Sequence, residues 1–227
     1  MANNIFGIIL AGGQGTRMGN AERPKQFMEI GRKPIIVHTI EKFVIHSAFD
    51  RIIVLSPKAW ISHTKDLIRK YIPDHSDIIV IPGGSTRNET IMNAIRYIEE
   101  NFGLDDDTII VTHDSVRPFV SHRMIEENIQ AAVEYGACDT VIPASDTIVE
   151  SQDHKFISSI PDRSAMYQGQ TPAVFPGKKT PGYLCGSFFR RKRNYSRMPA
   201  KSLFLKEKRS ILWKAMLQIS KYTYPSD

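Results

Sequence analysis

The chain has 227 residues, 24% of them charged, and a formal net charge of +6. This length predicts one domain with a sizeable core. The sequence shows no apolar stretch long enough to cross a membrane and no signal-peptide pattern at its start. Its two cysteines are too few for a disulfide framework or a zinc site, so we expect a cytoplasmic protein.

The charge is distributed unevenly along the chain. Residues 1–174 contain 17 lysines and arginines and 22 acidic residues, for a net charge of −5. Residues 175–227 contain 13 basic and 2 acidic residues, for a net charge of +11. A basic tail of this kind can indicate a nucleic-acid partner.

Apolar runs alternate with segments of helical periodicity through the first 143 residues. Strands are predicted at 5–10, 51–56, 78–82, 108–113 and 140–143, and helices at 34–45, 61–71, 87–101 and 121–135. This alternation is typical of an α/β fold with a mostly parallel sheet covered on both faces. The next segments, 147–150 and 155–160, predict a hairpin that projects as an arm.

The first predicted strand leads into a loop with glycines at positions 12, 13, 15 and 19. Glycine lets the backbone approach a ligand, and successive amides in such a loop form a concavity that suits phosphate oxygens. Arg17 and Lys25 bring positive charge to the same place. The loop matches neither the Walker pattern nor the dinucleotide fingerprint. It therefore predicts either a different triphosphate site or an ordinary glycine-rich turn.

Two more polar segments follow predicted strands. Residues 83–90 open a helix, where free amides bind anions and carbonyls, although an ordinary N-cap explains them equally well. Asp114, at the end of the next strand, is well placed to hold Mg²⁺, while Arg117 could equally be a structural partner of its carboxylate. Ligands in parallel sheets bind at the carboxyl ends of the strands, so we expect these segments and the glycine loop to share one edge.

Taken together, these segments resemble a known enzyme family. Its matching stretches are residues 10–18 with 24–26, 83–90, 113–118, 146–148 and 170–172. They are similar, in order and spacing, to the cytidylyltransferases of sugar-alcohol phosphates, which include the methylerythritol-phosphate and ribitol-5-phosphate enzymes. The resemblance implies a Rossmann-like three-layer sandwich, of the nucleotide-diphospho-sugar transferase type, over residues 1–174. It includes a β-arm at about 144–170.

The resemblance also implies roles for the matching residues. Arg17 and Lys25 are expected to be catalytic, stabilising charge as pyrophosphate leaves CTP, and Asp114 to bind Mg²⁺, the expected cofactor. The residues expected to bind the nucleotide are Leu10, Ala11, Gly12, Gly13, Gly84, Ser85, Arg87, Thr90 and Ser115. Those expected on the acceptor side are Arg117, Thr147, Arg163 and Thr171. In the family the arm crosses to the other subunit of a homodimer, so Arg163 would act there.

Residues 160–172 are more similar to the ribitol-5-phosphate branch, because the methylerythritol branch usually has a Leu-Trp-like pair at Met166 and Tyr167. The expected reaction is therefore transfer of CMP from CTP to D-ribitol 5-phosphate. It gives CDP-ribitol and pyrophosphate, for teichoic acid or another cell-wall or capsule polymer. The alternatives are the methylerythritol-phosphate reaction of isoprenoid synthesis and a nucleotide-binding protein with impaired catalysis.

The resemblance stops after Val174, where the charge also changes sign. Residues 175–227 lack the family's late motifs, and residues 223–227 alone look like the end of the last one. We infer a disrupted reading frame across about residues 175–221, which one uninterrupted family-like frame in the coding DNA would refute. Because the basic tail begins where the inferred frame disruption begins, a nucleic-acid partner is the weaker interpretation.

Overall fold

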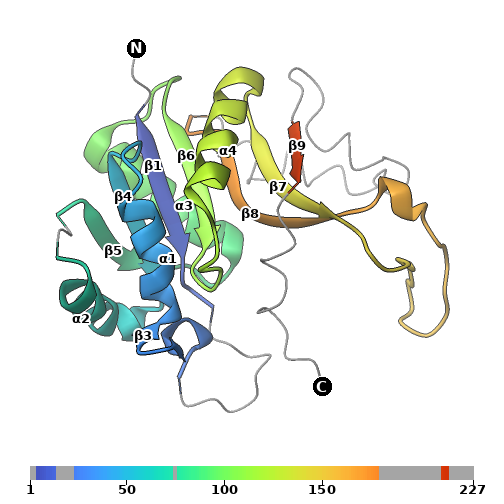
Figure 1. Ribbon diagram of the computed structural model, residues 1–227, viewed down its shortest axis with the longest axis horizontal. Coiled ribbons are helices and arrows are strands. Elements are labelled where there is room, and N and C mark those ends of the chain that lie inside the picture. Colours follow the sequence, from blue (N-terminus) through green and yellow to red (C-terminus); the bar gives the residue numbers. More distant parts are fainter. Residues whose placement is uncertain (1–3, 14–22, 74–75, 179–210, 215–227) are drawn as a thin grey trace.

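The computed structural model describes residues 4–13, 23–73 and 76–178, and the backbone of 211–214. Its centre is a seven-stranded sheet with the strand order β5-β4-β1-β6-β8-β7-β9 (Figure 1). The strands are β1 (Ile5–Leu10), β4 (Arg51–Ser56), β5 (Ile78–Pro82), β6 (Ile109–Asp114), β7 (Cys138–Pro143), β8 (Tyr167–Pro176) and β9 (Ile211–Lys214). A separate hairpin pairs β2 (Glu29–Ile30) with β3 (Lys33–Pro34).

The sheet is mostly parallel. Strands β5, β4, β1 and β6 run parallel to one another, while β8 runs antiparallel to both β6 and β7. The backbone of β9 pairs parallel with β7 at the edge. Because β1 and β6 lie side by side, the loops that follow them leave the same edge of the sheet.

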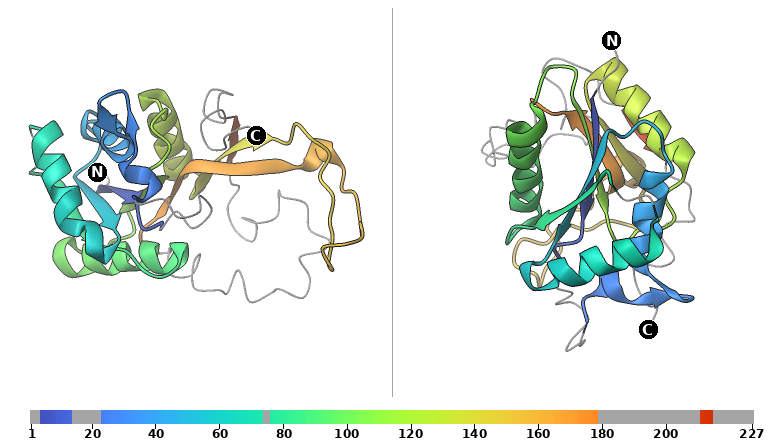
Figure 2. Two further views of the ribbon diagram at one scale, coloured as in Figure 1. Left: turned by 90° about the horizontal axis from the view of Figure 1, so that it is seen from below. Right: turned by 90° about the vertical axis from the view of Figure 1, so that its left-hand side faces the viewer.

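Helices cover both faces, as the sequence predicts (Figure 2). The helices are α1 (Ile35–Val44), α2 (Ile61–Tyr71), α3 (Arg87–Phe102) and α4 (His122–Tyr135), with 3-10 turns η2 (Lys25–Phe27), η3 (Lys58–Trp60) and η4 (Arg163–Ala165). Strand β1 shows why helices cover both faces of the sheet. Ile5 and Ile9 pack in the core under α1, α2 and α4, whereas Phe6 and Ile8 pack in the core under α3. Alternation of apolar side chains on a buried strand thus builds the three-layer sandwich.

The predicted elements of the first 143 residues all form, within one or two residues of their expected bounds. The sequence did not predict the two short strands β2 and β3 or the ten-residue strand β8. Strand β8 continues to Pro176, so the sheet runs past the boundary expected at Val174. None of the helices in the described ranges is long and apolar enough to span a membrane.

The arm is present, but its form differs from the expected hairpin. Residues 144–166 project away from the sheet (Figure 1). Within them the only described pairing is one antiparallel bridge between Glu150 and Ser159. The Asp153 carboxylate accepts backbone hydrogen bonds from Lys155 (3.0 Å) and Phe156 (2.9 Å), so a side-chain-capped turn replaces regular strands.

Candidate functional site

Backbone hydrogen bonds join the loops at the carboxyl edge of the sheet. The amide of Ser115 donates to the carbonyl oxygen of Leu10 (3.0 Å), and the amide of Ala11 donates to that of Leu55 (2.9 Å). The amide of Gly83 donates to Ser56 (2.9 Å) on the next strand. The three segments expected to bind ligand are therefore held along one edge, in the order that the sheet imposes.

The start of the glycine loop is attached to the segment that carries Lys25. The Gln26 side chain is buried, and its Nε2 atom donates to the carbonyl oxygens of Ala11 (2.7 Å) and Gly13 (3.2 Å). Lys25 begins the 3-10 turn η2 beside this contact. Sequence reasoning missed the role of Gln26, although its position next to Lys25 was a usable signal. Arg17 lies outside the described residues.

The loop before α3 is organised around Thr90. Its hydroxyl accepts a hydrogen bond from the amide of Gly84 (2.9 Å) and donates to the carbonyl oxygen of Thr86 (2.8 Å). Glu89 accepts from the amide of Ser85 (2.8 Å) and also contacts the Ser85 hydroxyl. A Cβ atom added at Gly12 would lie 3.5 Å from the Thr90 hydroxyl, so this loop and the glycine loop are adjacent. The residues expected at the nucleotide thus converge.

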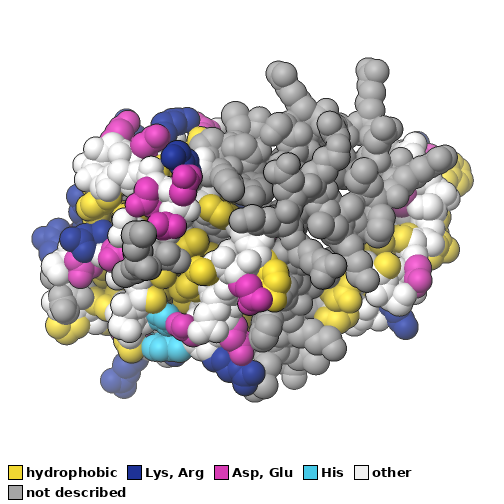
Figure 3. All heavy atoms as spheres, turned by 90° about the horizontal axis from the view of Figure 1, so that it is seen from above, with side chains coloured by type: hydrophobic (Ala, Val, Ile, Leu, Met, Phe, Trp, Pro, Cys, Tyr) yellow, Lys and Arg dark blue, Asp and Glu magenta, His cyan; other side chains and the backbone are white. Residues whose placement is uncertain are grey.

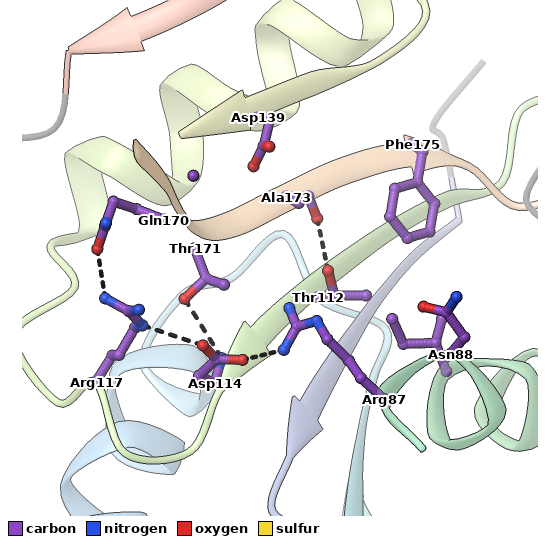
Figure 4. A pocket seen from close by; sticks show the side chains of 12 residues that line it. Arg87, Asn88, Thr112, Asp114, Arg117, Asp139, Gln170, Thr171, Ala173 and Phe175 are labelled. Carbon is purple, nitrogen blue, oxygen red and sulfur yellow. Dashed lines mark hydrogen bonds and ion pairs between the residues drawn. The ribbon is translucent and has the colours of Figure 1, made fainter. Parts of the chain in front are cut away.

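Asp114 forms the centre of an ion-pair cluster (Figure 4). Its Oδ1 accepts from Nη1 of Arg87, and its Oδ2 accepts from Nε of Arg117 at 3.0 Å. Arg117 also donates to Oε1 of Gln170, and the amide of Asp114 lies 3.4 Å from the Thr171 hydroxyl. Arg117 is therefore a structural partner of the Asp114 carboxylate, a role that the sequence left open.

The cluster keeps the Asp114 carboxylate ionised. Burial by itself raises the pKa of Asp114, but the charge and hydrogen bond of Arg87 together with the charge of Arg117 outweigh it, so the pKa lies below its ordinary value. His113 beside it is fully buried, and burial lowers its pKa to about 4. Its Nε2 atom lies 3.0 Å from the carbonyl oxygen of Arg117, which fits a neutral, structural imidazole.

A pocket of about 400 Å³ opens beside this cluster (Figure 4). Four of the residues that the sequence singled out line it, namely Arg87, Asp114, Arg117 and Thr171. The sequence did not predict the other lining residues of β7 and β8, which are Asp139, Gly169, Gln170, Ala173 and Phe175. The signal that could have found Gln170 is its place directly before the Thr-Pro pair of the family pattern.

The arm residues lie apart from this pocket. Thr147 and Arg163 are exposed, and neither lines the pocket. Nη1 of Arg163 donates to the carbonyl oxygen of Ser145 (3.1 Å), which joins the two ends of the arm. Within one described chain, the acceptor residues expected from the resemblance are therefore divided into two groups, Arg117 and Thr171 in the pocket and Thr147 and Arg163 on the arm.

The side chains around Asp114 provide only part of the set of ligands that Mg²⁺ needs. No group of three or more His, Cys, Asp or Glu side chains gathers in the part of the chain that the structure describes. Asp114 supplies one ionised carboxylate, and Mg²⁺ is often bound by one or two carboxylates together with substrate phosphates and water. The residues therefore fit Mg²⁺ brought by a phosphorylated ligand better than a cation held by protein alone.

The chain matches a family of known proteins and several solved structures. A family model described as IspD, 2-C-methyl-D-erythritol 4-phosphate cytidylyltransferase, matches residues 5–180. A 4-diphosphocytidyl-2C-methyl-D-erythritol synthase from Anaerococcus prevotii is 26% identical with a TM-score of 0.65, over 82% of this chain and 77% of that one.

Two further solved structures show the same fold. One is described as a 4-diphosphocytidyl-2C-methyl-D-erythritol synthase, at 23% identity and a TM-score of 0.74, over 99% of this chain and 94% of that one. The other is a Francisella tularensis 2-C-methyl-D-erythritol 4-phosphate cytidylyltransferase, at 22% identity and a TM-score of 0.72, over 97% and 94%.

Proposed function

Since this chain belongs to the IspD family and is a cytidylyltransferase, we propose that it transfers CMP from CTP to a polyol phosphate. A phosphate oxygen of the acceptor attacks the α-phosphorus of CTP, and the bond to pyrophosphate breaks. The product is a CDP-alcohol, and no covalent enzyme intermediate forms. The observation that carries this proposal is the convergence of the glycine loop, the Thr90 loop and the Asp114 cluster at one edge of the sheet.

The residues of this edge suit the reaction, because phosphoryl-type transfer depends mainly on positioning and charge stabilisation. Residues 10–13 and the loop around Gly84 and Thr90 bind the nucleotide. Arg17 and Lys25 stabilise the charge that develops toward pyrophosphate. Asp114 would hold Mg²⁺, which supplies positive charge to the phosphates when it is bound.

We favour ribitol 5-phosphate as the acceptor because residues 160–172, with Met166 and Tyr167, are more similar to the ribitol branch. A second candidate acceptor is 2-C-methyl-D-erythritol 4-phosphate, which fits the family match at least as well. The ribitol reaction would serve cell-wall polymer synthesis, and the other reaction isoprenoid synthesis.

The deciding experiment measures pyrophosphate release from CTP and Mg²⁺, with each of the two polyol phosphates offered separately. Turnover with ribitol 5-phosphate alone supports our first choice, and turnover with the methylerythritol compound alone reverses it. CTP binding without turnover on either would instead support an impaired nucleotide-binding protein. Arg17→Ala and Lys25→Ala should each lower kcat by about 10²- to 10³-fold, while Lys42→Ala on the exposed side of α1 should not.

We also propose that the arm joins two copies of this chain. Phe156, Ile157 and Ile160 on the arm are 75%, 62% and 62% exposed, and apolar side chains are visible on the arm in Figure 3. Clustered exposed apolar side chains are typical of a protein interface. In such a dimer Arg163 would complete the acceptor site of the other subunit.

Mixing two inactive variants tests this arrangement. Lys25→Ala and Arg163→Ala place their defects in different subunits of a shared site, so a re-formed mixed dimer contains one site with both residues intact. We expect activity to return on mixing, whereas a monomer or a site contained within one chain would leave the mixture inactive.

A further inference from the structure

The Asp139 carboxylate borders the pocket without a full set of hydrogen-bond donors. Asp139 lies on β7 opposite Ala173 of β8, and Figure 4 shows its side chain directed from β7 toward the space beside β8. Its Oδ1 atom is buried and has no hydrogen-bond partner among the described residues. The pocket that it lines also contains Arg117 and Thr171, the two acceptor-side residues of the sheet.

An unpaired buried carboxylate oxygen is costly and calls for an explanation, which in many proteins is a ligand. Burial raises the pKa of Asp139 to about 6, and the charge of Arg87 and the backbone hydrogen bond of Thr140 offset this only in part. At neutral pH the group is therefore mostly ionised. The two nearby arginines already donate to other groups, Arg87 to Asp114 and Arg117 to both Asp114 and Gln170.

The charge of Asp139 selects among possible donors. A carboxylate repels phosphate, so the phosphate ends of CTP and of the acceptor are excluded as its partners. The pocket has a nucleotide-side residue, Arg87, but Asp139 lies on β7 against β8, the strand that carries the acceptor-side residue Thr171. A hydroxyl group on the carbon chain of the acceptor is the donor that this side of the pocket would meet, and its hydrogen bond to a carboxylate would be charge-assisted.

We propose that Asp139 binds a hydroxyl group of the polyol phosphate and thereby selects acceptors that carry a hydroxyl at that carbon. This inference rests on the proposed function, because it names the group that recognises the acceptor of that reaction. A site built to bind a hydroxyl discriminates strongly against an analogue that lacks it, since the buried acceptor atom then stays unpaired.

Because Gly169 on β8 has no side chain, the space beside the Asp139 carboxylate is open to a ligand. Among the described residues, only Oδ2 of Asp139 would lie within 4 Å of a Cβ atom added at Gly169, at 3.9 Å. Alanine therefore fits at this position without a clash, but its methyl group occupies the space next to the carboxylate. Gly169→Ala is a second variant that obstructs the same approach without removing a buried group.

The test compares KM values for the acceptor and for CTP in the full-length enzyme with Mg²⁺. Asp139→Asn and Gly169→Ala should raise the KM for the preferred polyol phosphate by about 10- to 100-fold, the range for a lost hydrogen bond to a charged group. The KM for CTP should stay within about twofold. Cys138→Ala is the matched control, because the neighbouring Cys138 side chain contacts Asn128 of α4 (3.2 Å) instead of the pocket.

A structural role for Asp139 would change the KM for CTP, or lower the melting temperature, together with the acceptor KM, and that result would overturn the inference. An unchanged acceptor KM in both variants, with normal wild-type turnover, would also overturn it and leave the proposed function intact. Wild-type enzyme that uses neither polyol phosphate would overturn both.

Discussion

The Nε2 atom of Gln26 donates to the carbonyl oxygen of Ala11 at 2.7 Å, in the buried interior. This one hydrogen bond ties the segment of Lys25 to the start of the glycine loop, across fifteen positions of sequence. The expected catalytic lysine is therefore positioned by a neighbouring amide side chain.

Replacing Gln26 tests this arrangement. Gln26→Ala leaves the carbonyl oxygens of Ala11 and Gly13 without their donor. We expect a loss of about 1–3 kcal/mol in the free energy of unfolding. We also expect a fall in kcat of up to about 100-fold, because small displacements of a catalytic group are costly. Urea unfolding and steady-state kinetics measure both effects, with the exposed Gln130→Ala as control. A Gln26→Ala enzyme with normal kcat would contradict the positioning role.

Gly84 should be essential to the nucleotide loop. A Cβ atom at this position would lie 2.5 Å from Cγ and 2.7 Å from Cβ of Glu89, so the loop would have to move. We expect Gly84→Ala to raise the KM for CTP by about tenfold or more, a loss of about 1.4 kcal/mol in binding. The neighbouring Gly83→Ala is the control, since its nearest contact would be 3.4 Å. Equal effects of the two variants would argue against this steric explanation.

Asp114 should control the dependence on divalent cations. Asp114→Asn removes the charge that faces Arg87 and Arg117. We expect kcat/KM to fall by about 10²- to 10³-fold, and saturation to require more Mg²⁺; chelation with EDTA should abolish wild-type activity. Initial rates across a Mg²⁺ series measure this. Asp77→Asn breaks the ion pair with Arg51 at the other edge of the sheet. It should keep the wild-type dependence of rate on Mg²⁺ concentration.

Asp139 should make stability depend on pH. Its pKa in the folded protein is about 6, against about 3.9 for an exposed aspartate. The folded protein therefore holds a proton that the unfolded chain has already lost, and stability falls as the pH rises from about 4 to 6. The shift of about two units corresponds to roughly 3 kcal/mol.

Asp139→Asn stays neutral at every pH, so we expect it to lack this decrease and to be more stable than wild type at pH 8. Urea midpoints for both proteins at pH 4 and pH 8 provide the measurement. A variant less stable than wild type at pH 8 would show that the carboxylate contributes favourably to the fold.

Much of the fold could be predicted from local patterns. The apolar runs of β1, β4, β5 and β6 and the periodicity of α1 to α4 are each visible within a short window, because a buried strand or an amphipathic helix is a local property. Strand β8 could not be identified in this way. Its polar start, from Gln168 to Thr171, resembles a loop and becomes a strand only because β6 and β7 lie on either side.

The sequence by itself determined the family, the three loops and the candidate residues within them, since each of these is carried by residues close together in the chain. Only the tertiary structure decided which partners these residues have. Asp114 contacts Arg87 from 27 positions away, and Arg117 contacts Gln170 from 53 positions away. Asp139 likewise reaches the pocket only because β7 pairs with β8. Such contacts depend on strand order and register, which the whole sheet sets and no short segment encodes.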